Sequence, residues 1–226
     1  MVLPGDALEV LAPPPQYVGR GGDKMAGALD QFDIDPAGWR CVDVGSSTGG
    51  FTDCLLQRGA SSVVAIDVGR AQLHERLRGD DRVDVREQTD VRSVDMAAIN
   101  APFDLVVIDV SFIGLERVLA PVIELAGAAG RIVALVKPQF EAGRADADKG
   151  RGVITDPAIW KRVLVDTVES ARAAGLVCVA VGVSPIKGGA GNVEFFVYLG
   201  ALDSGLADTA TEADIEAALA GAGALP

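Results

Sequence analysis

The sequence predicts an α/β fold in which helices cover both faces of a seven-stranded, mostly parallel sheet. Apolar runs of strand length alternate with segments whose apolar residues recur at helical spacing, a pattern typical of such sheets. The chain has 226 residues, 49% of them hydrophobic, which is enough for one substantial core. The last two apolar runs are joined by a turn too short for a helical crossover, so we expect an antiparallel last strand.

Seven runs are predicted to be strands because each is short, apolar and bounded by glycine, proline or charged residues. They span residues 40–45, 62–67, 83–87, 103–109, 131–137, 176–183 and 193–199. Only the segment SPIKGGAGN separates the last two runs. We therefore expect those two strands to pair with each other at one end of the sheet.

Helices are indicated where the apolar spacing changes. Between the fourth and fifth strands one apolar stripe covers residues 115–126, and Pro121 is expected to kink this helix or shift its start. Before the sixth strand, Asp156 is expected to cap a helix that has Pro157 at its first position. A further helix is expected to begin at about Phe51.

The two ends of the chain are expected to lie outside this core. Residues 1–16 contain a strand-like piece followed by three consecutive prolines, which indicate a stiff linker. Residues 203–226 are small and acidic and are expected to form a detached tail with one weak helix near 211–220. This division leaves residues 17–202 as the central domain.

The composition argues against several classes of protein. Three cysteines without a CxxC pair and a single histidine argue against a disulfide framework and a zinc site, and favour a reducing cytoplasm. The longest uncharged apolar stretch, AAGLVCVAVGV, is much shorter than the roughly 20 residues of a membrane span. The N-terminus has no secretory signal pattern. We expect a soluble cytoplasmic protein without a metal.

The net charge of −12 argues by itself against a nucleic-acid partner, because phosphate binding usually needs a basic face. Several bases, however, are predicted to lie in loops that contain glycine or proline. They are Arg20, Lys24, Lys137, Arg144, Lys149, Arg151 and Lys187. A locally basic site on an otherwise acidic protein is therefore an alternative.

A glycine-rich turn follows the first predicted strand and precedes a helix, where backbone N–H groups can face a ligand. It differs from the dinucleotide pattern G-x-G-x-x-G and follows an acid inside the strand. That acid would repel a pyrophosphate and attract a sulfonium or ammonium group, which favours S-adenosylmethionine over a nicotinamide dinucleotide. The alternative is a tight strand–helix connection. The candidate cofactor-binding residues here are Asp43, Gly45, Ser46, Ser47, Thr48, Gly49, Gly50 and Phe51.

Two further acids follow neighbouring strands. Asp67 closes the second strand, close to the spacing at which an acid binds ribose hydroxyls. Asp90 follows the third strand, from where a side chain can reach an adenine ring. A helix cap explains Asp67 as an alternative, and explains Asp90 equally well.

Five stretches resemble one family of enzymes. They are YVGRGGDKM (17–25), VDVGSSTGGFTDCLL (42–56), DLVVIDVSFI (104–113), LVKPQFE (135–141) and GNVEFFVYL (191–199). In this order they resemble the haemolysin A, or TlyA, family of ribosomal RNA 2′-O-methyltransferases, which are related to the FtsJ-like enzymes. The resemblance implies a Rossmann-like methyltransferase fold and S-adenosylmethionine as cofactor. It also implies ribosomal RNA within ribosomal subunits as partner, with cytidines of 16S and 23S RNA as targets.

The resemblance also implies a catalytic set formed by Lys24, Asp109, Lys137 and Glu194. A ribose hydroxyl is a poor nucleophile, so positioning it and removing its proton are the main tasks. Lys137 is the expected base or hydroxyl polariser, because a lysine that loses its hydration becomes a usable base. Lys24 and Asp109 would tune it, and Glu194 would orient them. The alternatives are a Lys137 that reaches solvent, an Asp109 that caps a helix, and surface charges at Lys24 and Glu194.

The family carries an N-terminal S4-type RNA-binding module, and residues 1–16 resemble only its last strand and linker. Residues 139–155 are a candidate loop for closing over substrate, with a disordered loop as the alternative. Three other functions compete. They are a nucleotide-dependent oxidoreductase, a non-catalytic ribosome-assembly RNA binder and a membrane-active haemolysin, the last without a basic amphipathic helix to support it. The oligomeric state is not predicted.

Overall fold

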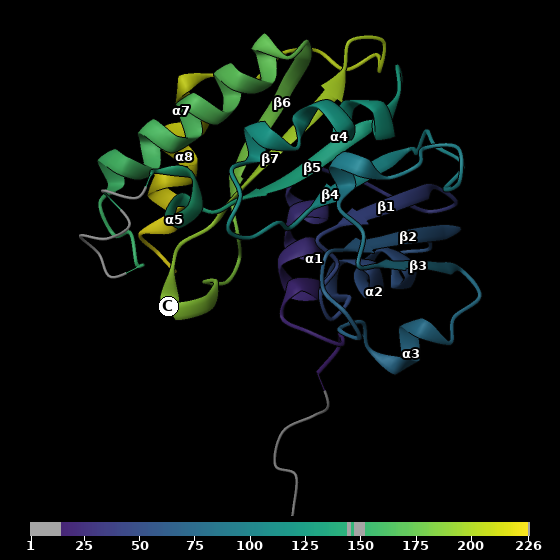
Figure 1. The fold of residues 1–226 in the computed structure, drawn as a ribbon. Helices are drawn as coiled ribbons and strands as arrows, with labels where there is room; N and C mark the ends of the chain where they lie inside the picture. The colour runs from purple at the N-terminus through teal and green to yellow at the C-terminus, as the bar shows by residue number, and fades with distance from the viewer. Residues whose placement is uncertain (1–14, 144–145, 147–151, 226) are drawn as a thin grey trace, which may run out of the picture.

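A computed structural model of the chain describes residues 15–143, 146 and 152–225. It confirms the predicted α/β arrangement of one seven-stranded sheet between two layers of helices (Figure 1). The strand order is β3-β2-β1-β4-β5-β7-β6. The strands are β1 (Arg40–Val44), β2 (Ser62–Asp67), β3 (Val83–Glu87), β4 (Leu105–Ile108), β5 (Arg131–Val136), β6 (Leu176–Val183) and β7 (Phe195–Ala201).

Strands β1 to β5 pair in parallel, whereas β7 runs antiparallel to both β5 and β6. The predicted antiparallel last strand is therefore confirmed. Because of this reversal, Phe195 at the start of β7 pairs with Val136 at the end of β5. Residues that lead into β7 consequently lie at the carboxyl edge of the parallel strands, where α/β proteins bind their ligands.

The helices follow the predicted pattern with one shift. They are α1 (Gly21–Gln31), α2 (Gly50–Gln57), α3 (Glu75–Arg78), α4 (Leu119–Ala126), α5 (Pro138–Glu141), α7 (Pro157–Ala173) and α8 (Glu212–Ala222), with short 3₁₀ turns η1 (Val91–Ser93), η2 (Leu115–Arg117) and η3 (Gly189–Gly191). The stripe over 115–126 is divided between η2 and α4, so Pro121 falls in the first turn of α4, where an N–H has no partner within the helix. Asp156 caps α7 by accepting a 2.9 Å hydrogen bond from the Ala158 N–H, as predicted.

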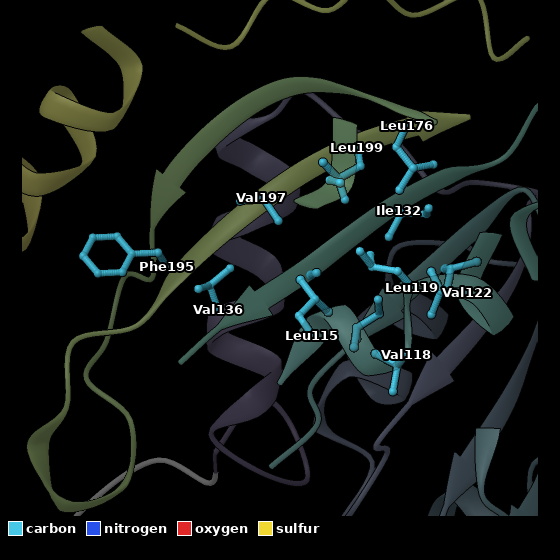
Figure 2. Packing of buried hydrophobic residues seen from close by; sticks show 14 of the residues in the cluster. Leu115, Val118, Leu119, Val122, Ile132, Val136, Leu176, Phe195, Val197 and Leu199 are labelled. Atoms are coloured by element: carbon cyan, nitrogen blue, oxygen red, sulfur yellow. The ribbon is translucent and has the colours of Figure 1, made fainter. Parts of the chain in front are cut away.

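The two faces of the sheet support separate apolar clusters. Alternate residues of β5 point to opposite faces, so Ile132 and Val136 join the cluster under α4, α7 and α8, while Val133 joins the cluster under α1 and α2. Figure 2 shows Leu119 and Val122, among other residues of η2 and α4, against strands β5 and β7. Both layers therefore hold the carboxyl edge of the sheet in place.

The C-terminal segment packs against the core, so the expectation of a detached tail is wrong. Ile215, Ala218 and Ala222 of α8 are buried in the cluster that contains α7 and β6. These residues recur at three- and four-residue spacing, which gives α8 an apolar stripe of small side chains. Most of the predicted N-terminal linker, residues 1–14, lies outside the described residues.

Lys24 lies on helix α1, not in the loop that its glycine-rich surroundings suggested. The glycines serve close packing instead. A Cβ at Gly22 would lie 2.2 Å from Tyr17 Cγ, and a Cβ at Gly50 would lie 2.7 Å from the Gly22 backbone nitrogen. The first turns of α1 and α2 therefore meet backbone to backbone. The predicted loop 139–155 also differs, because it begins inside the short helix α5.

Candidate active site

Four segments that are distant in sequence bring the predicted catalytic residues together. Asp109 and Lys137 directly follow β4 and β5, and Glu194 directly precedes β7. The antiparallel direction of β7 is what places Glu194 at the same edge as the other two. Lys24 reaches this edge from α1, where its Nζ atom lies 2.6 Å from Glu194 Oε2.

The four side chains form two ion pairs, in which three side chains are buried and that of Asp109 is 23% exposed. Lys137 Nζ lies 2.5 Å from Asp109 Oδ1, the counterpart of the pair between Lys24 and Glu194. The residue exposures are 8% for Lys24, 7% for Lys137 and 2% for Glu194, so none of these is the solvated surface charge of the alternative interpretation. Asp109 does not cap η2, whose N-cap is Gly114. Charges this well buried are stable only when they are paired.

The two ion pairs also act on each other. Burial raises the pKa of Asp109 above its ordinary value, although the positive charges of Lys137 and Lys24 oppose that rise. The negative charge of Glu194 adds to it. The ionisation of Asp109 therefore depends on the charges of the other three members of the set.

Two residues at this edge were not identified from the sequence. Ser111 accepts a 2.9 Å hydrogen bond from Lys137 Nζ. Asn192, 2% exposed, accepts a 3.0 Å hydrogen bond from the Ile154 N–H and donates one of 2.9 Å to the Gly152 carbonyl. Both lie within two residues of a predicted catalytic residue, in the stretches DVSFI and GNVEF, which was the only available signal.

The glycine-rich turn closes against the end of β4. Gly45 has a φ of 87°, and a Cβ there would lie 2.6 Å from the Asp109 carbonyl oxygen. Beside this contact is a cavity of about 310 Å³. Of the predicted site residues, the cavity wall contains Gly45, Ser47, Asp67, Asp90 and Asp109.

Two acids of this wall are held in place by backbone groups. Asp67 accepts a 2.8 Å hydrogen bond from the Ser47 N–H, which ties the glycine-rich turn to the end of β2. Asp90 caps η1, as the alternative for this residue proposed, and it also pairs with Arg92. This pairing lowers the pKa of Asp90 to about 2, so its carboxylate stays charged at the cavity.

The remaining predicted cofactor-binding residues do not line this cavity. Asp43 is fully buried, and its Oδ2 atom caps α2 by accepting hydrogen bonds from the Thr52 N–H and hydroxyl at 3.0 and 2.7 Å. Burial raises the pKa of Asp43 to about 7, and its Oδ1 atom has no hydrogen-bond partner among the described residues. Phe51 packs in the core against Phe196. The other residues outside the wall are Ser46, Thr48, Gly49 and Gly50.

The cavity suits a cationic ligand better than a pyrophosphate. Three carboxylates, those of Asp67, Asp90 and Asp109, line it. Asp90 is paired with Arg92 and Asp109 with Lys137, so Asp67 is the one of the three without an ion pair among the described residues. Such a wall attracts a sulfonium or ammonium group and repels phosphates. The strongly exposed Val68 also lines this cavity. Within residues 15–143, 146 and 152–225, no group of three His, Cys, Asp or Glu side chains is arranged to hold a metal ion.

A second cavity, of about 690 Å³, lies on the other side of Phe112. Phe112 and Ile113 belong to both cavity walls. Phe112 is 90% exposed at a φ of 64°, and its ring centroid lies 4.9 Å from that of Phe140. Lys137 Nζ lies 5.8 Å from the Phe140 ring centre. An exposed aromatic side chain thus stands between the two cavities, close to the predicted catalytic residues.

Comparison with known proteins identifies the family of the chain. Residues 17–201 match the model of the FtsJ-like methyltransferase family. The chain is 47% identical over 183 residues to the 16S/23S rRNA (cytidine-2′-O)-methyltransferase TlyA of Mycobacterium tuberculosis, an alignment that covers 81% of this chain and 68% of that protein.

Solved structures show the same fold. A crystal structure described as a hemolysin from Lactococcus lactis superposes with a TM-score of 0.84 at 42% identity, over 91% of this chain and 98% of that one. An S-adenosylmethionine-dependent methyltransferase from Listeria monocytogenes superposes with a TM-score of 0.59 at 14% identity, over 80% of this chain and 97% of that one. The latter likeness shows the fold alone.

None of the described helices has the length and apolar character needed to cross a membrane. The family match covers the whole segment that contains the four predicted catalytic residues and the glycine-rich turn. The chain is therefore an enzyme of the FtsJ-like methyltransferase family, in the branch that contains TlyA.

Proposed function

We propose that this protein is a cytoplasmic methyltransferase that transfers the methyl group of S-adenosylmethionine to ribose 2′-hydroxyls of ribosomal RNA. Cytidines of 16S and 23S RNA are the proposed targets, by similarity to the Mycobacterium tuberculosis relative. One observation carries the proposal above the others. Two lysine–carboxylate pairs, Lys24–Glu194 and Lys137–Asp109, lie at the carboxyl edge of the sheet, and Asp109 lines the cavity there.

The cavity residues fit the proposed cofactor. When bound, S-adenosylmethionine supplies an electrophilic methyl group on a positively charged sulfur. Asp67 would accept hydrogen bonds from the ribose hydroxyls and Asp90 from the adenine amino group, since both carboxylates line the cavity. Asp43 supports the glycine-rich turn from beneath by capping α2. Ser46, Thr48, Gly49, Gly50 and Phe51 shape the same turn.

Lys137 is proposed as the base. In its uncharged form, its Nζ atom would accept the proton of the ribose 2′-hydroxyl as the hydroxyl oxygen bonds to the methyl carbon. The electron pair of the broken methyl–sulfur bond would stay on the sulfur, and S-adenosylhomocysteine would leave. Asp109, at 2.5 Å, offsets the positive charge that then develops on the amine. Lys24 and Glu194 compensate each other's charge, and because both are buried, their side of the site has little contact with water. A solvent molecule later removes the proton from Lys137.

The surface around the site supports a local contact with RNA on an otherwise acidic protein. The guanidinium of Arg20, just before α1, donates a hydrogen bond to the backbone carbonyl of Lys187 in the β6–β7 turn. Two of the predicted loop bases are therefore adjacent, on the segments that flank Lys24 and Glu194. Of the other loop bases, Arg144, Lys149 and Arg151 lie outside the described residues. We further propose that residues 1–16 are the end of an S4-type RNA-binding module and its linker.

Methyl transfer to ribosomal subunits tests this function. The protein is incubated with radiolabelled S-adenosylmethionine and purified small and large subunits, and the labelled nucleotide is mapped. Lys137→Ala is expected to abolish transfer and to keep its affinity for S-adenosylmethionine, measured by calorimetry. Lys161→Ala is the matched control, since Lys161 forms only surface pairs with Glu212 and Glu216. Normal transfer by Lys137→Ala would reject the catalytic assignment.

The same variants separate the competing functions. A non-catalytic ribosome-assembly binder would bind subunits equally well in both variants and would transfer no label in any of them. A membrane-active protein would release dye from liposomes in the absence of RNA, and we expect no release. No observation at the site favours either of these functions.

A further inference from the structure

The amine of Lys137 has two close oxygen neighbours, and they act on it differently. Asp109 Oδ1 is 2.5 Å away and forms an ion pair with the amine. Ser111 Oγ is 2.9 Å away and accepts a hydrogen bond from Lys137 Nζ. Ser111 therefore gives this amine a neutral hydrogen-bond acceptor beside its charged partner.

This difference determines which neighbour can orient the amine. An ion pair attracts the amine in all of its rotational states, whereas a hydrogen bond weakens steeply away from linearity and so selects one rotation. An uncharged amine has two N–H bonds and one lone pair. When one N–H is directed at Ser111, the lone pair is restricted to the two remaining tetrahedral positions.

We propose that Ser111 is a positioning residue that orients the Lys137 amine toward the acceptor hydroxyl. The inference rests on the proposed function and adds to it a residue outside the Lys–Asp–Lys–Glu set. The proton balance of the reaction is unchanged, because the 2′-hydroxyl proton moves to Lys137 Nζ. Ser111 keeps its own proton throughout and remains an acceptor.

The place of Ser111 in the fold supports this role. It lines the cavity of about 310 Å³ together with Asp109, two residues earlier, so it faces the space that the cofactor and acceptor share. The next residue, Phe112, has a φ of 64°, a backbone conformation that is strained for an aromatic residue. This sharp turn directs consecutive side chains apart. Ser111 then faces Lys137 while Phe112 faces solvent.

Kinetics of Ser111→Ala test the proposal. Removing the hydroxyl is expected to lower kcat about tenfold, the effect of losing one hydrogen bond to a charged or reacting group. The KM for ribosomal subunits and the Kd for S-adenosylmethionine are expected to stay within about twofold of wild type. Ser111→Thr, which restores the hydroxyl, is expected to recover most of kcat.

Ser61→Ala is the matched control. Ser61 is also exposed and its hydroxyl also makes one hydrogen bond, of 2.9 Å to the Trp39 carbonyl, but it lies at the opposite edge of the sheet. This variant is expected to have wild-type kcat. An equal loss of kcat in Ser61→Ala and Ser111→Ala would indicate general destabilisation and overturn the proposal.

A pH profile distinguishes orientation from simple packing. An acceptor at Ser111 stabilises the charged form of the amine more than the neutral form. Ser111→Ala is therefore expected to move the ascending limb of the kcat profile to lower pH. In RNA-free protein labelled with ¹³C-lysine, the Cε resonance assigned to Lys137 is expected to shift its titration in the same direction.

The two proposals fail differently. A wild-type protein that transfers no methyl group to ribosomal RNA would reject the proposed function, and the lysine resonance would then decide the role of Ser111 alone. An active wild type with an equally active Ser111→Ala would reject the role of Ser111. A Ser111→Ala variant whose loss lies in KM or in cofactor Kd would make Ser111 a ligand contact and would equally reject the proposal.

Discussion

Gly188 lies against the carboxylate of Glu194 so closely that a Cβ at position 188 would be 2.0 Å from Glu194 Oε1. Glu194 is 2% exposed and bonded to Lys24, so it has little space into which to move. The absence of a side chain at residue 188 is therefore a condition for the ion pair. It explains why the β6–β7 turn has a glycine here although its backbone φ, −70°, suits any residue.

Gly188→Ala is expected to displace Glu194 and lower methyl transfer at least tenfold, with a loss of roughly 1–3 kcal/mol in the free energy of unfolding from overpacking. The neighbouring Gly189 is a matched control, because a Cβ there meets nothing within 4 Å. Gly189→Ala is expected to change stability by no more than about 0.5 kcal/mol. Urea denaturation and the subunit assay measure both variants, and equal activities would contradict the explanation.

Breaking the Lys24–Glu194 pair from one side leaves an uncompensated buried charge. Lys24→Met or Glu194→Gln alone is expected to cost roughly 3–5 kcal/mol of unfolding free energy. The double variant is expected to lose less unfolding free energy than the two single variants lose together, since neither charge then remains buried alone. A double-mutant cycle by denaturation measures this coupling. The exposed pair Lys161–Glu212 is the control, with an expected coupling below about 1 kcal/mol.

The stability of the cofactor-free protein is expected to fall as pH rises from about 4 to about 7. Burial raises the pKa of Asp43 to about 7 from an ordinary value of 3.8, so the folded protein holds this proton more tightly than the unfolded chain across that window. Asp43→Asn cannot ionise, and its oxygen can still accept from the Thr52 N–H. Denaturation is expected to show that the free energy of unfolding of the wild type falls between pH 5 and pH 8. In Asp43→Asn this fall is expected to be smaller by a few kcal/mol. If the free energy of unfolding changed equally with pH in both proteins, Asp43 would not be the residue that causes the decline.

Phe112→Ala is expected to impair binding of the RNA substrate. An exposed ring between two cavities can stack on a base, an interaction of roughly 1–3 kcal/mol, so the KM for subunits is expected to rise about tenfold. The control is Leu202→Ala, because Leu202 is also strongly exposed but lies after β7, away from both cavities. If both variants have the wild-type KM, Phe112 does not contact the substrate.

The sheet was predictable because each strand carries its own local signal. An apolar run that ends in a charged or polar residue locates both the strand and the residue at its edge, which is how Asp67, Asp109 and Lys137 could be placed together. The reversal of β7 followed from the length of one turn. Glu194 itself was named only through the family resemblance, and the reversal of β7 is what brings it to the same edge.

The features that were mispredicted depend on contacts between distant segments. Gly21 and Gly22 resemble a loop when read along the chain, and only their contact with Gly50 shows why a helix contains them. Asp43 was expected to face the ligand, but it caps α2 and lies outside the cavity wall. The small residues of α8 give too weak a periodicity to indicate that β6 and α7 bury them.

The backbone contact between α1 and α2 has a consequence for how the enzyme becomes ready to react. Gly50 begins the helix that follows the glycine-rich turn, and Gly22 is two residues from Lys24. Gly50 and Gly22 are in contact through backbone atoms, without a side chain of either residue between them. A small displacement of the glycine-rich turn would therefore displace the first turn of α1. A methyl donor that fixes the position of the glycine-rich turn would therefore also fix the position of the Lys24 ammonium group on α1, before RNA binds.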